Sequence, residues 1–580
     1  MPPDPQIHCS HEEGVRYRDG VYLPVDADAL PAAPAPGPEG PRAFPDPGHG
    51  PPLRRLDGVP RVPRLRDVVG PSVIALGMGL GAGEFLLWPN LIAVNGFSIW
   101  WLFWIGVLTQ FVVIGEIERW TLATGESVFA GMARLTRVPF WPWFFLVATI
   151  VSFFWPGWAA ESADFTRATI NAIAGREALG AWQPLALAML AFIWAALALS
   201  RIVYNALERF EIGLVLLFFP LLFVALLAAG VLPGQVGALL TGAVWIGRAP
   251  EALLSGEQFP TLLIAVAYAG SGGTLLLAQS LWVRDKGFGM GAYQGRIAGI
   301  RGRDEPLHDP GFAFSAEDPV QRTRFRRWMG LAERELLATF VLLILASVVV
   351  TTLLVAATIG TDRPDLAGNL NGMVLEQAEV LRGRTGPVLP LLFLLGGALV
   401  LFSTQFGIVD TVTRITGDIV HERVGKRRGW TLKRTFLVLL TVVVAAGMAV
   451  VGVSWRMDET VQALSPDFLV LIAGPFTIAS MYAFAVVVTL VNVRLLPPAL
   501  RMPRWKLVSM YWAVVLWGWF TAETVSRVVM SQALGLSGST VSTVAFHPVR
   551  AAVYLAWLAS LAWLVARTAR PGFARHVPLD

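Results

Sequence analysis

The sequence contains little charge and almost no cysteine. Of its 580 residues, 15% are charged and 55% are hydrophobic. Soluble domains carry about a quarter charged residues, so this balance excludes an ordinary soluble protein and predicts several membrane spans. The one cysteine, Cys9, excludes an internal disulfide, and there is no cysteine cluster of the kind that binds zinc or an iron–sulfur cluster.

Histidine is absent from the apolar segments. All seven histidines fall in tails or loops: His8, His11, His49, His308, His421, His547 and His576. A proton pathway through the membrane would therefore use carboxylates. His8, Cys9 and His11 are three potential metal ligands on a flexible tail, but structural metal sites usually need four.

Signals for other classes of protein are also missing. The first fifty residues lack the apolar core of a signal peptide. The Gly-rich segment 287–291 has no flanking strand and helix that would make it a phosphate loop. No catalytic constellation is visible, so we expect neither an enzyme nor a cofactor. The net charge of +5 comes from basic residues in short loops, which does not suggest nucleic acid as a partner.

Twelve apolar segments are long enough, or nearly so, to cross a bilayer, which takes about 20 residues. They lie near 68–94, 98–121, 139–160, 181–200, 209–231, 259–282, 330–358, 387–412, 432–454, 467–492, 507–530 and 549–567. Residues 1–66 are polar and Pro-rich, which predicts a disordered cytosolic tail.

Basic residues indicate the orientation of these segments. Loops that follow even-numbered segments are rich in arginine and lysine, as at Arg134 after the second and Lys426 after the eighth, whereas the alternate loops are poorer. Cytoplasmic loops carry this excess. We therefore expect both termini in the cytoplasm of a multi-pass plasma-membrane protein.

The first apolar segment is interrupted at residues 77–84, Gly-Met-Gly-Leu-Gly-Ala-Gly-Glu. Glycine weakens a helix by roughly 1 kcal/mol, and a charge at the centre of a membrane helix costs about 3 kcal/mol on insertion scales. A discontinuous helix whose freed backbone groups face a ligand explains both features. The alternative is a glycine face for tight helix packing, with Glu84 paired to a neighbour.

The sixth segment, 259–282, has the same plan, because two apolar halves flank Gly270-Ser-Gly-Gly273. Paired interrupted helices point to a transporter binding site at the membrane midplane. Each begins a five-helix unit, 67–231 or 259–500, and the odd helix number inverts the second unit. Residues 501–580 add two helices and a short cytosolic C-terminal tail. The predicted fold is all-α, with discontinuous helices 1 and 6.

This layout resembles the LeuT-type fold of the amino acid–polyamine–organocation superfamily, and more closely the Nramp family of proton-coupled divalent-metal transporters. The resemblance covers most of 68–490 as organisation but only a few segments by residue. These are Gly70-Pro71, the segment from Gln110 through Glu116, Glu118 and Arg119 to Thr124-Gly125-Glu126, and Gln279-Ser280-Leu-Trp-Val-Arg284.

The chain departs from this family where the family binds metal. The family's Asp-Pro-Gly-Asn break in helix one aligns with Gly81-Ala-Gly-Glu84, and its Met-Pro-His break in helix six aligns with Ser271-Gly-Gly273. Acidic residues in the middle of the family's third helix fall on the aromatic stretch 153–158. The interrupted architecture is kept, but the family's ligands are replaced.

The candidate substrate-binding residues lie at the two interruptions: Met78, Gly81, Ala82, Gly83 and Glu84 in the first, and Tyr268, Ser271, Gly272, Gly273 and Thr274 in the second. Glu84 could be a metal ligand, a proton carrier or the partner of a cationic substrate. Hydroxyl and carbonyl oxygens suit Mg²⁺ or Mn²⁺. Met78 could supply a thioether or simply pack in the core.

Other polar residues are candidates for a proton or ion pathway: Glu116, Glu161, Asp164, Gln405 and Asp410. Glu116 could equally form an interfacial ion pair with Arg119, and Asp410 an intrahelical pair with Arg414. Glu161 and Asp164 could form an outer cation funnel or be solvated.

Two functions fit these features. The first is an Nramp-like secondary transporter that moves a cation, foremost a divalent metal ion such as Mn²⁺ or Mg²⁺, by alternating access, with proton coupling as an option. The second is a transporter of a small organic solute such as an amino acid or amine, in which Glu84 would hold an ammonium group. A non-transporting sensor would be expected to carry a folded cytosolic domain, and none is visible. Oligomeric state is left open.

Overall fold

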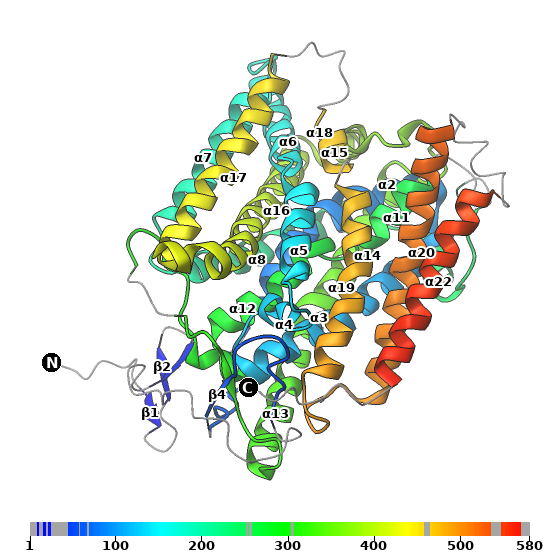
Figure 1. Cartoon of the computed structure of the whole chain (residues 1–580). Helices are drawn as coiled ribbons and strands as arrows, with labels where there is room; N and C mark the ends of the chain where they lie inside the picture. Colours follow the sequence, from blue (N-terminus) through cyan, green and yellow to red (C-terminus); the bar gives the residue numbers. More distant parts are fainter. Residues whose placement is uncertain are drawn as a thin grey trace.

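The computed structural model is almost entirely helical (Figure 1). It describes residues 8–10, 15–18, 21–24, 44–56, 58–65, 69–250, 253, 258–302, 307–456, 465–471, 473–534 and 547–569. Nine helices in this part of the chain are long and apolar enough to cross a membrane. The chain is a multi-pass membrane protein of the all-α class.

The first five-helix unit begins with an interrupted helix and ends at Ala229. Its elements are α1 (Pro71–Gly79), a π-helical segment η3 (Leu80–Leu87), α2 (Trp88–Asn95), α3 (Trp101–Thr124), α5 (Phe140–Phe153), α6 (Gly157–Ala174), α7 (Gln183–Ala198) and α8 (Val203–Ala229). Shorter helices η4 (Phe97–Ile99), α4 (Val128–Ala133) and α9 (Pro233–Val244) lie in or after its loops.

The second unit begins with the broken sixth helix. Its elements are α11 (Phe259–Ala267), the 3₁₀ helix η5 (Gly273–Ala278), α12 (Gln279–Lys286), α13 (Pro319–Leu336), η7 (Leu337–Val341), α14 (Leu342–Thr358), α16 (Val388–Val420), α17 (Leu432–Ser454), α18 (Pro466–Leu471) and α19 (Gly474–Arg494). Short helices η6 (Gly289–Tyr293), η8 (Pro364–Leu366), α15 (Leu370–Thr385), η9 (His421–Gly425) and η10 (Lys426–Arg428) lie in its connections. The two added helices are α20 (Arg504–Leu534) and α22 (Pro548–Ala569).

Each of the twelve expected apolar segments corresponds to a helix or an interrupted helix, but several helices are longer than expected. The helix of the third segment bends after α5 and continues through α6 to Ala174. The helix of the seventh segment starts at Pro319, and that of the eighth continues to Val420. Their extra turns carry charged residues, which lower hydropathy and hide the helix from a search for apolar runs.

The two interruptions take different forms. Helix six is broken outright between α11 and η5, with positive φ at Gly270, Gly272 and Gly273. Helix one is not unwound, contrary to the expectation; instead it widens into η3 and continues as α2. A π segment keeps the backbone hydrogen-bonded and still displaces the helix face, which suits a stretch buried on all sides.

Part of the segment expected to be disordered is packed against the bundle. Residues 44–65, here called the N-terminal segment, carry β4 (Arg54–Arg55), which pairs in parallel with β5 (Phe312–Ala313). The Val59 N–H donates to Gln321 Oε1 at 2.7 Å, and Trp328 Nε1 donates to the Pro60 carbonyl at 2.8 Å. A proline-rich segment can pack without regular secondary structure. The prediction of disorder, which rested on composition alone, was therefore wrong for this segment. Upstream, β1 (His8–Ser10), β2 (Val15–Arg18) and β3 (Val21–Pro24) form an antiparallel sheet that includes His8 and Cys9; His11 lies outside the described residues.

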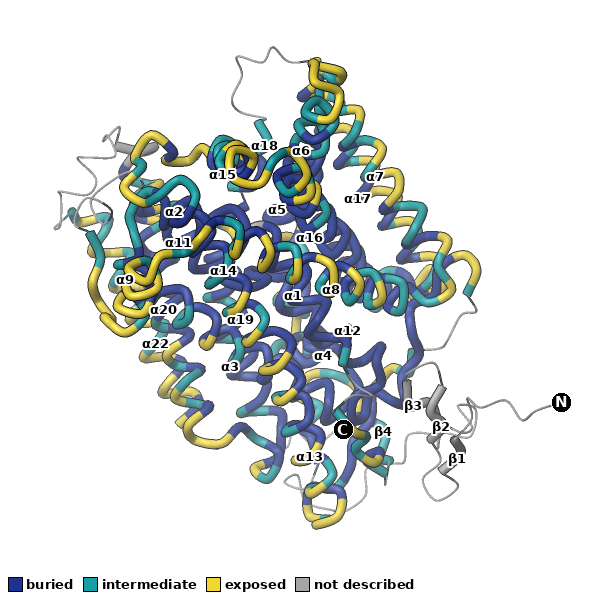
Figure 2. The backbone as a smooth tube through the Cα atoms, turned by 180° about the vertical axis from the view of Figure 1, so that it is seen from behind, coloured by how far each residue is buried: buried dark blue, intermediate teal, exposed yellow. Residues whose placement is uncertain are grey.

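Helix α16 lies in the middle of the molecule. It packs against α1, α6, α8, α15 and α17. Figure 2 shows a buried interior along α1, α12 and α16 and exposed faces on the peripheral helices. The exposed side chains on those faces are largely apolar, for example Phe192, Leu216 and Leu555, as expected for helices that face lipid.

Candidate functional site

Glu84 lies where the two interrupted helices meet. Its side chain, in η3, is fully buried, and its Oε1 accepts a hydrogen bond from the Gly270 N–H at 3.0 Å. Its Oε2 has no hydrogen-bond partner among the described residues. The Glu84 carbonyl accepts from Thr351 Oγ1 at 2.7 Å, which anchors η3 to α14. A buried carboxylate with one free oxygen can hold a cation or a proton.

The break in helix six is supported mainly by protein groups. Gln110 on α3 donates to the carbonyls of Ala267 and Ala269, at 3.1 and 2.8 Å. Ser271 Oγ donates to the Ala75 carbonyl at 2.6 Å, which ties the break to α1. The freed carbonyls of Ala267 and Ala269 therefore bind the Gln110 side chain, whereas we expected them to face a ligand.

The glycines of helix one permit close packing. A Cβ on Gly83 would lie 2.0 Å from the Tyr268 carbonyl oxygen, and one on Gly81 would lie 2.3 Å from Thr404 Oγ1. Gly79 similarly faces the backbone of Gly270, at 2.9 Å. For the glycines, the structure has the tight-packing arrangement that was the alternative. Ala82 lies in η3, but its side chain is outside the described part of the structure.

Aromatic rings border the break in helix six. Tyr268 lies edge-on to Trp158, with ring centroids 6.1 Å apart, and its hydroxyl is 3.3 Å from Thr477 Oγ1. Phe153 is the nearest neighbour of Gly273, 3.0 Å from where a Cβ would be. Thr274 Oγ1 is buried without a hydrogen-bond partner among the described residues. The site thus combines one carboxylate, hydroxyl groups and three aromatic rings.

Met78 belongs to the helix packing. Its thioether sulfur accepts from Thr411 Oγ1 at 3.4 Å, and its side chain fills the space beside Gly407 on α16. Nor do the described residues bring three or more histidine, cysteine or acidic side chains together in a group that could hold a metal ion. Glu84 is therefore the one carboxylate that the interruptions themselves supply.

Glu116 is in an ion-pair cluster. Arg119 binds it with two hydrogen bonds of 2.7 and 2.9 Å. Lys506 on α20 lies 3.3 Å away, and Asn492 on α19 donates to it at 3.0 Å. This arrangement joins three helices, so Glu116 has the interfacial pairing that was one of its two expected roles.

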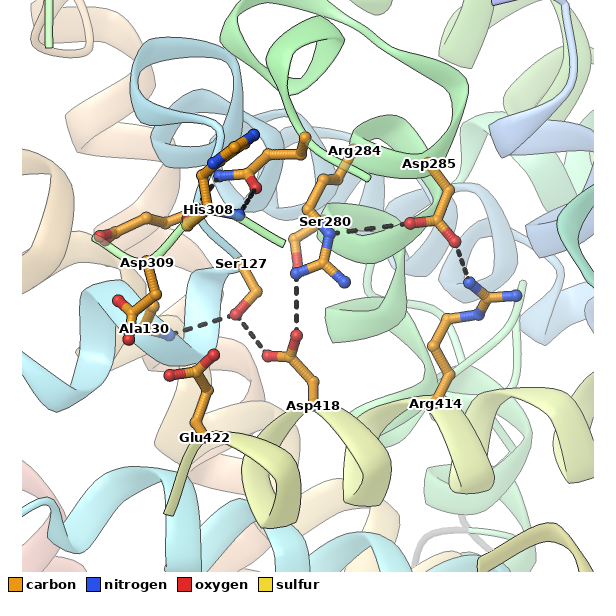
Figure 3. A network of polar contacts seen from close by, with 12 residues as sticks. Ser127, Ala130, Ser280, Arg284, Asp285, His308, Asp309, Arg414, Asp418 and Glu422 are labelled. Atoms are coloured by element: carbon orange, nitrogen blue, oxygen red, sulfur yellow. Dashed lines mark hydrogen bonds and ion pairs between the residues drawn. The ribbon is translucent and has the colours of Figure 1, made fainter. Parts of the chain in front are cut away.

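Asp410 is likewise paired, within a buried ionic network that joins α12 to α16. Figure 3 shows the part of this network formed by Arg284, Asp285, Arg414 and Asp418. Arg414 binds Asp410 through two hydrogen bonds of 3.0 Å and also contacts Asp285 of α12. One turn further along α16, Asp418 accepts from Arg284 at 2.8 Å and from Ser127 Oγ at 2.6 Å. This network holds the second half of helix six against α16.

The network continues into the adjoining loop, where Lys426 Nζ lies 2.5 Å from Asp309 Oδ2. Burial raises the pKa of Asp309, but the ammonium group of Lys426, a hydrogen bond with Glu422 and the charge of Arg134 together leave the pKa below its ordinary value. Nearby, burial and the charge of Arg54 lower the pKa of His308. These loop contacts lie at the end of the bundle where the N-terminal segment packs.

The remaining pathway candidates lie on or beside α6. Gln405 Oε1 accepts from the Ala159 N–H at 3.2 Å and so caps the start of α6 after the bend. Asp164 is paired with Arg167 at 2.7 Å. Glu161 is neither solvated nor in a surface funnel: its side chain is fully buried, and neither carboxylate oxygen has a hydrogen-bond donor among the described residues.

Three buried glutamates were missed as site residues in the sequence. Glu211 on α8 accepts from Ser403 Oγ at 2.6 Å and faces Gly77, whose Cβ would lie 1.9 Å from it. Glu335 on α13 accepts from the Gly70 and Ser72 N–H groups, at 3.1 and 3.2 Å, and so caps α1. Glu118 accepts from Gln279 at 2.8 Å. An acidic residue inside or beside an apolar segment was the signal that could have found them.

Comparisons with known proteins identify the fold. Neither protein-family models nor curated proteins give a match to the chain. Among solved structures, two mutants of the manganese transporter of Eremococcus coleocola match with TM-scores of 0.61 and 0.60, each at 13% sequence identity. Each match covers 88% of this chain and 98% of that transporter. At this identity the likeness shows the fold alone, and it confirms the predicted LeuT-type arrangement.

Proposed function

We propose that the protein is a secondary transporter that moves a cation by alternating access, with Glu84 as its binding carboxylate. The observation that carries this proposal is the position of Glu84, buried between the two interrupted helices with one oxygen unpartnered. A carboxylate at this depth is costly unless a cation or a proton neutralises it, and residues of this kind mark ion or substrate pathways.

A divalent metal ion is the first candidate for the substrate. The fold shared with a manganese transporter supports it. Glu84 Oε2 and Thr274 Oγ1 are both buried oxygens without partners, and such hard ligands suit Mn²⁺ or Mg²⁺. Because one carboxylate is few for a bare divalent ion, the ion would keep part of its hydration shell, as Mg²⁺ does.

A small organic amine or amino acid is the second candidate, and the aromatic rings at the break favour it. Trp158 and Tyr268 lie edge-on to each other at this break, and aromatic faces attract ammonium groups. Under this alternative, Glu84 holds the ammonium group.

Alternating access would require the ionic network around Arg414 to open. In the structure this network joins α12 to α16. Under this proposal it holds that end of the bundle closed. Movement of the second half of helix six away from α16 would break these contacts and open a path to Glu84.

Uptake into proteoliposomes tests the proposal. Proteoliposomes that contain wild type or Glu84→Gln are given Mn²⁺, Mg²⁺ or Ca²⁺ in turn, with and without an inward pH gradient. Uptake is followed by radioactivity or fluorescence. Glutamine keeps an oxygen that can accept from Gly270, so the variant removes the charge and keeps the helix contact. We expect saturable uptake that Glu84→Gln abolishes. Glu379→Gln, an exposed position on α15, is the matched control and should transport like wild type.

Three outcomes are informative. Metal uptake that Glu84→Gln removes supports a metal carrier. Absence of metal uptake, in vesicles where a known carrier works, rejects the metal and leads to a thermal-stabilisation screen of amines and amino acids. Unchanged metal uptake in folded Glu84→Gln would contradict the role of this carboxylate.

A further inference from the structure

Two acidic side chains meet at the end of the bundle opposite the N-terminal segment, where α18 lies on α6 (Figure 1). Gly157, the first residue of α6, allows this contact, because a Cβ there would lie 2.6 Å from the Leu469 carbonyl carbon. Glu161, one turn into α6, is fully buried beneath α18. Its carboxyl group lies within hydrogen-bonding reach of the carboxyl group of Asp467 on α18.

No ion pair joins this pair to a basic side chain in the part of the chain that the structure describes. Asp164 also faces Glu161, but it is already bound by Arg167 at 2.7 Å and by Asn371 Nδ2 at 3.1 Å. From α15, the Asn371 side chain faces Glu161, and the N–H groups of Leu370 and Asn371 face Asp467. Helix α7 has no charged residue, and α16 has none between Val388 and Val409.

Neighbouring carboxylates in a buried position cannot both be ionised without a cation between them. A shared proton removes the repulsion: one carboxyl group then donates its O–H to an oxygen of the other. In the described part of the chain, three oxygens of the pair lack a donor: Oε1 and Oε2 of Glu161 and Oδ1 of Asp467. One shared proton joins Oδ1 of Asp467 to one oxygen of Glu161 and leaves the other oxygen of Glu161 without a donor. A bound metal ion fits less well, because these side chains do not form a group of three potential metal ligands.

We propose that Glu161 and Asp467 form a proton-binding pair that holds one proton between them while α18 lies against α6. Loss of that proton leaves two like charges at the contact, which drives α18 away from α6 and opens this end of the bundle. Its role as the coupling site rests on the proposed transport function, whereas the proton site itself does not. Glu84 remains the separate position for the transported cation.

Infrared difference spectroscopy tests the proton site without any transported substrate. The purified full-length protein is titrated with base, and the carbonyl stretching band of a protonated carboxylic acid is followed. We expect wild type to lose such a band as the pH rises. The part of this band that comes from the pair should be absent from Glu161→Gln and from Asp467→Asn, whereas any part that comes from Glu84 remains in both. The exposed-site control Glu379→Gln should keep the whole band. Elution of each variant as a folded monodisperse protein is checked first.

Two infrared results would overturn the proposal. The first is a band that persists unchanged in both single variants, which would place the proton elsewhere. The second is displacement of the wild-type band by Mn²⁺ or Ca²⁺ at fixed pH, with no such displacement in Asp467→Asn, which would assign the pair to a metal ion. If either single variant does not fold, the double variant Glu161→Gln with Asp467→Asn, which removes both charges together, replaces it.

The coupling role is tested by flux. For whichever cation wild type carries, Asp467→Asn should lose acceleration by an inward pH gradient and keep exchange of labelled for unlabelled cation across the membrane. Full acceleration in this variant would overturn the coupling role. A chain that carries no tested cation would refute the proposed function, yet the infrared result would still decide whether the pair binds a proton.

Discussion

Two groups of buried carboxylates in this protein differ in their partners. Around α12 and α16, Asp285, Asp410 and Asp418 each contact an arginine. Between η3, α6 and α18, Glu84 and Glu161 are equally buried, yet neither has a basic partner among the described residues. Burial is therefore common to both groups, and what separates them is the presence of a fixed counter-charge.

This difference has a physical consequence for each region. A paired buried carboxylate is strongly held, because removal of either partner leaves an uncompensated charge in the interior. An unpaired one is ready to take up a proton or a cation, because either neutralises it. Substitutions in the first region should therefore lower stability, and substitutions in the second region should impair transport.

The largest expected effect is in the paired region. Arg414→Ala leaves Asp285 and Asp410 buried without their shared cation. The loss of one partner of a buried ion pair typically costs about 3–5 kcal/mol. We expect a large fall in the thermal unfolding temperature in detergent, or loss of the folded peak in size-exclusion chromatography. Arg427→Ala, at an exposed position, is the control and should unfold like wild type. Equal stability of the two variants would contradict the assignment of the network.

A smaller effect is expected where helix one meets helix six. Gly83→Ala places a methyl group 2.0 Å from the Tyr268 carbonyl oxygen, so the two helices must separate. Overpacking of this kind costs about 1–3 kcal/mol. Gly417→Ala is the matched control on α16, since no atom lies within 4 Å of its added Cβ, and it should leave stability unchanged or raise it slightly. The thermal unfolding temperatures of the two variants in detergent are compared. Equal values would contradict the close approach of Gly83 to the Tyr268 carbonyl.

The smallest effect is expected in the loops, where a protonated His308 would lie beside the like charge of Arg54. Arg54 Nη1 lies 3.4 Å from His308 Nδ1, and burial together with Arg54 lowers the pKa of His308. The unfolded chain therefore binds this proton at higher pH than the folded one, so stability falls as the pH drops through the unfolded value of about 6.5. The unfolding temperature of wild type minus that of His308→Gln should decrease on acidification from about pH 8 to pH 5. His49→Gln, at an exposed position, should give no such trend.

Much of the fold could be predicted from the sequence, because a membrane helix can be recognised from the apolar residues of its own segment. The glycines and the carboxylate at residues 77–84, and the glycines at 270–273, located both interruptions. Their different forms could not be predicted, since a π segment and a full break arise from the same kind of residues. What separates them is the support available from other helices, such as the hydrogen bonds from Gln110 to the carbonyls of Ala267 and Ala269.

The site was only partly predictable for a related reason. Glu84 was identified because its position alone is unusual. The pairing of Asp410 with Arg414 followed from helical spacing, whereas its link to Asp285 depends on how α12 meets α16. Asp467 lies at the start of an apolar segment, where the sequence indicates only an ordinary helix end. Its significance depends on α18 lying over Glu161, a contact that no local pattern encodes.

The most direct test of the account sets one carboxylate from each region side by side. Uptake per folded molecule is measured in the same proteoliposome preparation for Glu84→Gln and Asp410→Asn, with the amount of folded protein determined for each. The account predicts that Glu84→Gln is recovered in normal yield and does not transport. We expect Asp410→Asn to be recovered in low yield and still to transport, because it keeps Glu84 and weakens only a contact that opens during transport. Wild-type transport by Glu84→Gln would contradict it.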